Sequence, residues 1–172
     1  MNSENFQALQ PLTSPSSSPP PDPSIRDERS AGPKCERFVA FFLGEKLFGI
    51  QADKVAEVAQ PQHVTSLPNA GPGLMGITAL RGEVIAVLDL AHLLGEVSAP
   101  TAAKPKLVVL HGSHPETQFS FPVDRMHEVV SLTANQIEAG GSSSQIAGLA
   151  AVNGRVLYIL DPSSLAQFLT VT

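Results

Sequence analysis

Short apolar runs separated by glycine-containing turns dominate the chain beyond residue 37. The run 38–43 is apolar at every position, which is typical of a strand buried on both of its faces. A second apolar-rich run, 46–50, follows after only two residues. Because Gly44 would occupy the first central position of the connecting turn, we predict a type II′ β-hairpin here.

The next segments continue this alternation of strands and turns. Asp53 is a candidate N-cap for a short helical turn that includes Val55. A second hairpin is predicted over 74–88, with its turn at 81–83 between two apolar runs. Asp89 should then cap a short helix that ends at a glycine.

The second part of the chain repeats the first. The same strand, turn and helix signals return in the same order, and like residues recur at a constant spacing within each segment. The clearest matches are Phe48 with Phe119, Asp53 with Asp124, Lys54 with Arg125, Glu57 with Glu128, Gly76 with Gly148, Gly82 with Gly154 and Asp89 with Asp161. We interpret this pattern as an internal duplication of one β-rich unit.

A duplicated unit of about 65 residues is marginally stable alone, because a domain of that size buries only about 60% of its chain surface. We therefore expect the two copies to pack together as two related β-barrels with a groove between them, since closed sheets leave no exposed strand edge. The expected domain is 37–172. Within it we assign 37–95 and the C-terminal helix region to the first subdomain, and 106–161 to the second.

Two segments lack the apolar content of a folded unit. Residues 1–36 are rich in proline and serine, and we predict that they form a disordered tail. Proline spacing in the tail also leaves open a polyproline-II ligand for a partner domain. The segment 96–105 is polar, contains two prolines and is predicted to be a linker.

Charge and cysteine content narrow the range of functions. The formal net charge is -5 and no basic cluster occurs, so we expect binding neither to nucleic acid nor to an anionic membrane. Cys35 is the single cysteine, which excludes an internal disulfide and suits a reducing compartment. The sequence shows neither a signal peptide nor a membrane-spanning segment, so we expect a cytoplasmic protein.

No arrangement of ionisable or nucleophilic residues predicts catalysis. His111 and His114 form the only close histidine pair, and we interpret them as exposed residues of a hairpin turn rather than as metal ligands. The serines at 142–144 lie in a glycine-rich loop. Asp89 and Asp161 occupy equivalent places in the two copies and are better explained as helix caps. We therefore expect no enzymatic activity, no cofactor and no metal site.

One difference between the copies attracts a functional interpretation. The second hairpin turn of the first copy reads Leu80-Arg81-Gly82, where the second copy has a plain Val-Asn-Gly. Arginine is less suited than asparagine to such a turn, but its guanidinium recognises carboxylate or amide groups. Glu57 is a possible partner. The residues alone leave open whether Arg81 serves recognition or an ordinary surface ion pair.

Four motifs stand out along the chain: Leu-Gly-Glu-Lys-Leu-Phe-Gly-Ile at 43–50, Val-Ala-Glu-Val at 55–58, Gly-Ile-Thr-Ala-Leu-Arg-Gly at 76–82 and Ser-Leu-Thr-Ala-Asn-Gln-Ile at 131–137. These motifs resemble those of the CheW family of bacterial chemotaxis coupling proteins. The similarity extends from about residue 38 to 169. One departure is Ala79, where the family usually has asparagine before Leu-Arg-Gly.

The resemblance implies a mostly β fold of two five-stranded, SH3-like barrels. It also implies a non-catalytic cytoplasmic adaptor that couples chemoreceptor tips to a CheA-type histidine kinase and contacts other CheW-like domains in receptor arrays. The implied interaction residues for receptor or kinase are Val55, Glu57, Gly76, Leu80, Arg81 and Gly82. Two alternatives stay open: the equivalent adaptor of a type IV pilus twitching system, and a small-molecule sensor that uses the groove between the barrels.

Overall fold

The computed structural model describes residues 32–60, 63–96, 103–112, 114 and 117–169. The predicted disordered tail, 1–36, lies almost entirely outside the described residues, and so does most of the predicted linker at 96–105. The first described strand begins at Cys35, two residues before the expected start of the folded domain.

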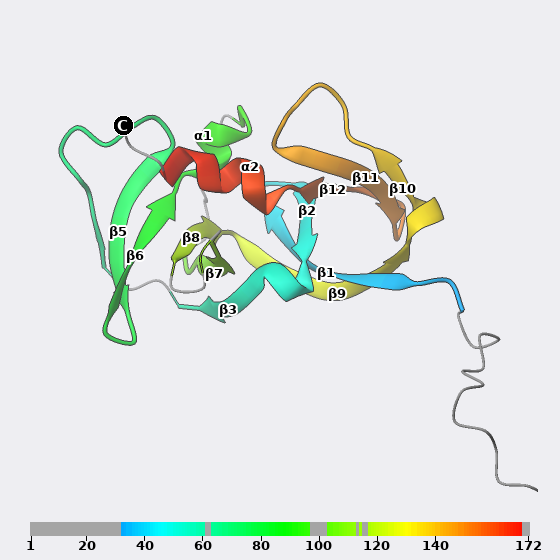
Figure 1. The fold of residues 1–172 in the computed structure, drawn as a ribbon, viewed down its shortest axis with the longest axis horizontal. Coiled ribbons are helices and arrows are strands. Elements are labelled where there is room, and N and C mark those ends of the chain that lie inside the picture. The colour runs from blue at the N-terminus through cyan, green and yellow to red at the C-terminus, as the bar shows by residue number, and fades with distance from the viewer. Residues whose placement is uncertain (1–31, 61–62, 97–102, 113, 115–116, 170–172) are drawn as a thin grey trace, which may run out of the picture. The chain divides into compact units, whose positions relative to one another are not determined.

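Twelve strands of the described residues form two six-stranded sheets, which we call sheet A and sheet B (Figure 1). Sheet A contains β1 (Cys35–Leu43), β2 (Lys46–Gln51), β9 (Arg125–Thr133), β10 (Ile137–Ala139), β11 (Ile146–Val152) and β12 (Arg155–Leu160). Sheet B contains β3 (Val55–Ala59), β4 (Val64–Thr65), β5 (Leu74–Leu80), β6 (Glu83–Leu88), β7 (Lys106–His111) and β8 (Gln118–Val123). The mostly β fold predicted from the sequence is confirmed.

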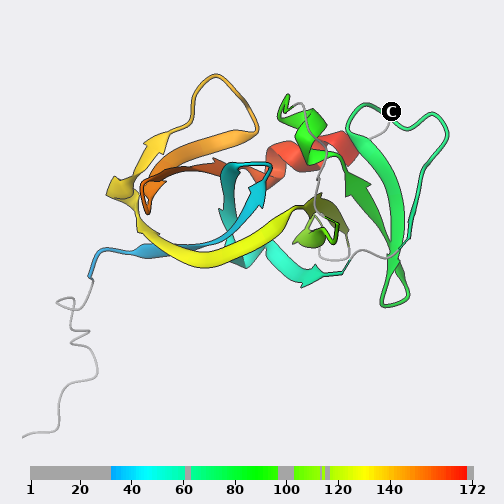
Figure 2. The same cartoon turned by 180° about the vertical axis from the view of Figure 1, so that it is seen from behind.

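Short helices join or follow the strands. They are η2 (Ala52–Lys54), α1 (Leu90–Leu93), η3 (Ala134–Gln136), α2 (Pro162–Ala166) and η4 (Gln167–Leu169). Each sheet curls, as both views show (Figures 1 and 2), and its two edge strands follow one another in the chain: β9 and β10 in sheet A, β3 and β4 in sheet B. We call the curled sheets barrel A and barrel B.

The two copies of the repeat exchange their first hairpins. The strand order is β10-β11-β12-β2-β1-β9 in sheet A and β3-β7-β8-β6-β5-β4 in sheet B. The β1–β2 hairpin of the first copy therefore joins strands of the second copy, and the β7–β8 hairpin joins strands of the first. The parallel pairs β12–β2 and β6–β8 make these joins. The barrels thus do not follow the expected division into 37–95 and 106–161, and each has six strands rather than five.

Alternating side chains of the exchanged strands enter two different cores. Phe38 and Phe42 of β1 lie in the core of barrel A, whereas Phe41 and Leu43 lie in a core shared by both sheets. This shared core also receives Phe119 and other residues of sheet B, together with α1 and α2. A strand between two cores must be apolar on both faces, which explains the uninterrupted apolar run 38–43.

The first hairpin turn has the predicted type. Leu43 pairs with Lys46, and Gly44 has a φ of 60°, as the first central position of a type II′ turn requires. Both central residues of the other two turns have positive φ: 52° and 87° for Arg81 and Gly82, and 49° and 75° for Asn153 and Gly154. These are the values of type I′ turns. The hairpin predicted over 74–88 is confirmed, but its turn contains only Arg81 and Gly82, because Leu80 pairs with Glu83 at the start of β6.

Two of the three predicted helix caps are confirmed. Oδ1 of Asp89 accepts a hydrogen bond from the backbone N–H of His92 at 3.0 Å, and Oδ1 of Asp161 accepts one from Ser163 at 3.0 Å. The prediction for Asp53 is wrong, because Asp53 lies inside η2 and Gln51 is its N-cap residue. Val55 accordingly begins strand β3 rather than belonging to a helical turn.

Candidate interaction site

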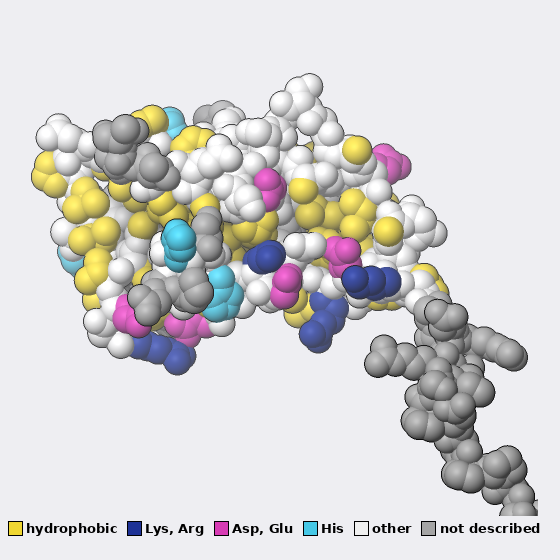
Figure 3. Space-filling view, viewed as in Figure 1, with side chains coloured by type: hydrophobic (Ala, Val, Ile, Leu, Met, Phe, Trp, Pro, Cys, Tyr) yellow, Lys and Arg dark blue, Asp and Glu magenta, His cyan; other side chains and the backbone are white. Residues whose placement is uncertain are grey.

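A pocket of about 300 Å³ lies at the end of barrel B where the β5–β6 hairpin turns. We call its surroundings rim B. Its lining residues are Ala56, Glu57, Leu80, Arg81, Glu83, His111 and Gln118. The lining comes from β3, from the β5–β6 hairpin and from the ends of β7 and β8, so segments distant in sequence meet here. Basic and acidic side chains lie together where this hairpin ends, at the lower left of Figure 3.

Arg81 and Glu57 form an ion pair on rim B. Nη2 of Arg81 lies 2.6 Å from Oε2 of Glu57, and the two side chains are 79% and 25% exposed. The partner predicted from the sequence is therefore confirmed. Glu57 is placed by a register shift in β3, after which it pairs with Val109, and Arg81 is placed by the hairpin turn.

The pair adds little to the stability of the fold. An exposed ion pair contributes roughly 0 to 1 kcal/mol. A non-glycine residue in the left-handed region costs on the order of 1 to 3 kcal/mol, and Arg81 has a φ of 52°. The arginine therefore does not improve stability at this turn, and its exposed guanidinium is available for recognition.

Barrel A contains the matching pair with a neutral turn residue. Nδ2 of Asn153 donates a hydrogen bond to Oε1 of Glu128 at 3.2 Å. Asn153 matches Arg81 in the repeat, and Glu128 matches Glu57. A side-chain link from the hairpin turn to β9 in barrel A, and to β3 in barrel B, is therefore a structural feature that both copies share. The positive charge of Arg81 is what distinguishes barrel B.

Exposed valines occur at matching positions of the two barrels, on β3 and β6 of barrel B and on β9 and β12 of barrel A. Val58 and Val84 are 42% and 69% exposed, and their repeat counterparts Val129 and Val156 are 57% and 50% exposed. Val84 pairs with Ala79 across the β5–β6 hairpin. Ala79, the residue that departs from the family motif, therefore places a small side chain beside the exposed side chain of Val84. Rim B thus combines a guanidinium with apolar surface, a composition typical of protein interfaces.

The structure gathers four of the six predicted interaction residues at this rim. Glu57, Leu80 and Arg81 line the pocket, and Gly82 completes the turn. Val55 instead packs against the shared core, opposite Leu110.

Gly76 is the other residue that lies apart from the pocket lining. It sits four residues before Leu80 on β5, roughly 13 Å away at the rise of a β-strand. A Cβ atom at Gly76 would lie 2.3 Å from the carbonyl oxygen of Thr65. Gly148, its counterpart in the repeat, is similarly crowded by Ile137, 2.7 Å from such an atom. This equivalence gives Gly76 a structural reason to be glycine.

Four residues that line the pocket were missed by sequence reasoning: Ala56, Glu83, His111 and Gln118. His111 is the last residue of β7 and pairs with Gln118 at the start of β8, so placing it in the hairpin turn was wrong. The misplacement arose because this hairpin has a longer loop than its counterpart after β1. Phe41 pairs with Phe48, and Leu110 pairs with Phe119. Because Phe48 matches Phe119 in the repeat, Leu110 matches Phe41 and His111 matches Phe42.

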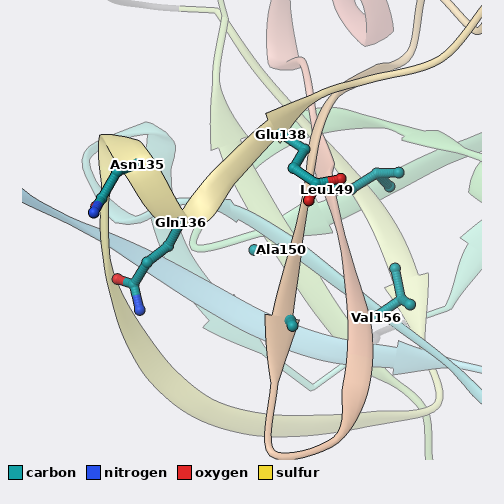
Figure 4. Close-up of a pocket in the computed structure, with 7 residues that line it drawn as sticks. Asn135, Gln136, Glu138, Leu149, Ala150 and Val156 are labelled. Atoms are coloured by element: carbon teal, nitrogen blue, oxygen red, sulfur yellow. The ribbon is translucent and has the colours of Figure 1, made fainter.

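A larger hollow of about 410 Å³ lies on barrel A (Figure 4). Gln136 and Glu138 line one side of it, and Leu149 and Val156 of β11 and β12 line another. Glu138 is its single ionisable lining residue. Among the described residues, no three histidine, cysteine or acidic side chains are grouped so that they could hold a metal ion. In the same residues, no helix has the length and apolar character needed to cross a membrane.

The fold and the rim can now be compared with known proteins. The model of the CheW-like domain matches residues 37–169 of the chain. The chain belongs to the CheW family. The resemblance predicted from the motifs at 43–50, 55–58, 76–82 and 131–137 is therefore confirmed.

Individual members of the CheW family agree with this assignment. The Chemotaxis protein CheW of Thermotoga maritima is 26% identical over 137 residues, which cover 77% of this chain and 89% of that protein. The protein of the same name from Klebsiella aerogenes is 27% identical over 132 residues, covering 73% and 78%. The crystal structure of scaffolding protein TtCheW from Thermoanaerobacter tengcongensis superposes with a TM-score of 0.71 at 25% identity, covering 79% of this chain and 90% of that one.

Proposed function

We propose that this CheW-like domain is a non-catalytic adaptor that couples chemoreceptors to a CheA-type histidine kinase. Family membership supports the proposal, as do the similar proteins called Chemotaxis protein CheW and the similar structure described as a scaffolding protein. The adaptor would act in the cytoplasm, beside membrane receptor arrays, and would also contact other CheW-like domains.

Rim B is the proposed contact surface for the receptor, and one observation carries this assignment. The Arg81 guanidinium is exposed but held by Glu57 at 2.6 Å. The exposed side chains of Val58 and Val84 lie on β3 and β6 of the same barrel. An anchored guanidinium loses less side-chain entropy when it binds a carboxylate or amide of a partner. The adjacent apolar surface would add affinity when it is buried.

Glu57, Leu80 and Gly82 have supporting parts in this proposal. Glu57 orients the guanidinium, Leu80 contributes apolar surface in the pocket, and Gly82 permits the turn. Val55 and Gly76 would act indirectly, since the first packs into the shared core and the second makes a close backbone contact. The proposal therefore expects direct receptor contact from Arg81 and support from the other five positions.

A bridging role also needs a surface for the kinase. The internal duplication supplies one, because each barrel presents its own rim and its own outer strands. Contacts of modest strength at several such surfaces would be reinforced by avidity within an array.

The test is to measure binding of the chain to the cytoplasmic hairpin of a chemoreceptor and to a CheA-type kinase from the same organism. We expect Arg81→Asp to weaken receptor binding at least about tenfold, which corresponds to 1.4 kcal/mol. Asn153→Asp is the matched control, because it changes the equivalent turn position on barrel A and should leave receptor binding intact. Undiminished receptor binding by Arg81→Asp would refute the assignment of rim B.

The equivalent adaptor of a type IV pilus twitching system is the second candidate. A partial match to Protein FrzA of Myxococcus xanthus, 34% identical over 74 residues and 46% of that protein, leaves room for a different behavioural output. Deleting the gene and scoring swimming and twitching separately distinguishes the two. A metabolite screen by thermal shift tests the small-molecule sensor, since a specific ligand would raise the unfolding temperature.

A further inference from the structure

The end of barrel A that corresponds to rim B has a different chemistry. We call it rim A and define it by Phe42, Arg125, His127, Glu128, Asn153 and Arg155. We infer that rim A binds an acidic segment of a partner protein through the guanidinium groups of Arg125 and Arg155. This site is separate from rim B, and the inference stands whether or not rim B binds receptors.

The two guanidinium groups are placed over one aromatic ring. The Cζ atom of Arg125 lies 4.0 Å from the centroid of the Phe42 ring, and that of Arg155 lies 5.8 Å from it. The His127 ring meets the same phenyl ring edge-on at 5.5 Å. Phe42 is only 6% exposed and belongs to the core of barrel A, so the cations gather around a fixed point.

Strand pairing holds the cluster in place. Arg125 is the direct cross-strand partner of Phe42 in the β1–β9 ladder, and Arg155 follows the type I′ turn at the start of β12. A cation over an aromatic ring gains about 0.5 to 1 kcal/mol at an exposed site. The ring therefore limits the freedom of the arginines before any ligand arrives, which lowers the entropy cost of binding.

The donors of both guanidinium groups are left without an acidic partner within the described part of the chain. Neither Arg125 nor Arg155 makes an ion pair within 4.0 Å there. Nearby carboxylates have other contacts: Glu128 accepts from Asn153 and lies 3.7 Å from Nε2 of His127, and Asp124 accepts from the N–H of Gly44 at 2.6 Å. Glu45, in the adjacent turn, is exposed and forms no ion pair with either arginine.

The repeat shows that the pair of arginines over one aromatic ring is particular to barrel A. The counterparts of Phe42, Arg125, His127 and Arg155 on barrel B are His111, Lys54, Ala56 and Glu83. Lys54 lies 3.7 Å from Asp53, and Glu83 reverses the charge found at Arg155. Arg125 and Arg155 thus lie together at one end of barrel A, although the chain has a formal net charge of -5.

The arrangement favours carboxylates carried on a peptide over a single small anion. Two separate guanidinium groups can each bind a carboxylate in the bidentate geometry that arginine prefers. A single phosphate has no second carboxylate to occupy the other guanidinium. We therefore expect an acidic peptide to bind with a higher affinity than inorganic phosphate.

The test uses the full chain and a fluorescein-labelled hexaglutamate peptide, with binding followed by anisotropy at low salt. We expect Arg125→Glu to weaken binding at least about tenfold, since charge-assisted hydrogen bonds are lost and a like charge is introduced. Lys54→Glu is the matched control, because it makes the same charge change at the equivalent position of barrel B. This control should change the affinity less than about twofold.

Three results would overturn the inference. The first is the absence of hexaglutamate binding, and the second is an equal loss of affinity in Arg125→Glu and Lys54→Glu, which would indicate only a general charge effect. The third is competition by inorganic phosphate at the same concentration of anionic groups, which would indicate a simple anion site. As an independent readout, the ¹⁵Nε signals of Arg125 and Arg155 should shift on addition of the peptide.

Discussion

The guanidinium of Arg81 lies 2.6 Å from the carboxylate of Glu57, although the backbone of Arg81 is held in the left-handed region with a φ of 52°. The same turn on barrel A has Asn153, a residue that tolerates this conformation more readily. Arg81 thus combines an unfavourable backbone conformation with an exposed charge. The combination is understandable if the charge serves binding rather than folding.

This relationship predicts opposite effects of Arg81→Asn on stability and on binding. Asparagine relieves the backbone strain and can repeat the hydrogen bond that Asn153 makes to Glu128. We expect the free energy of unfolding to stay the same or to rise by up to about 1 kcal/mol, while receptor binding weakens. Urea denaturation and titration with a receptor hairpin measure the two quantities. A large loss of stability would show that the arginine is needed for the fold.

Glu57→Gln tests the orienting role of the carboxylate. The substitution keeps the shape of the side chain but removes its charge, so the surface ion pair is lost at a cost of about 0 to 1 kcal/mol in stability. Receptor binding should weaken because the guanidinium becomes less restrained. In a double-mutant cycle with Arg81→Asn, the coupling in binding should exceed the coupling in stability. Equal coupling in both would argue against an orienting role.

Gly76→Ala should destabilise the fold by about 2 to 3 kcal/mol, because its Cβ would lie 2.3 Å from the carbonyl oxygen of Thr65 and 3.1 Å from the Cα of Ser66. Gly71→Ala is the matched control: no atom lies within 4 Å of a Cβ there, and its φ is not positive. We expect the control to change stability by less than about 0.5 kcal/mol. Similar stabilities of the two variants by thermal or urea unfolding would contradict the close contact.

The exchange of hairpins predicts that the two barrels unfold together. Leu165 of α2 is fully buried in the shared core, so Leu165→Ala should cost about 2 to 5 kcal/mol. Amide hydrogen exchange should then accelerate to a similar extent in the buried strands of both sheets. Protection lost in one sheet and retained in the other would mean that the barrels are separate folding units.

Local features of the fold could be predicted from the sequence because their causes are local. Gly44 specifies a type II′ turn by its tolerance of positive φ, and Asp89 and Asp161 reveal helix starts by their side-chain oxygens. Glu57 could also be named as a possible partner of Arg81, because the two side chains carry opposite charges. In each case the determining residues carry a distinct conformational or charge preference.

The exchange of the first hairpins could not be predicted in the same way. The apolar run 38–43 indicates burial on both faces but does not say which copy supplies the neighbouring strands. Parallel pairing of β12 with β2, and of β6 with β8, joins segments that are far apart in the chain and leaves no periodic signal. The place of His111 on rim B was missed for a related reason, since a change in loop length hides its correspondence with Phe42.

If this chain joins a receptor to a kinase, the three proteins must form a ternary complex. The receptor hairpin, the CheA-type kinase and the chain would be mixed in pairs and all together, and the masses of the complexes measured by light scattering. We predict that receptor and kinase assemble with each other only when the chain is present. The amount of this ternary complex should fall with Arg81→Asp and stay the same with Asn153→Asp. A chain that binds neither protein, or a receptor–kinase complex of undiminished amount without it, would contradict the account.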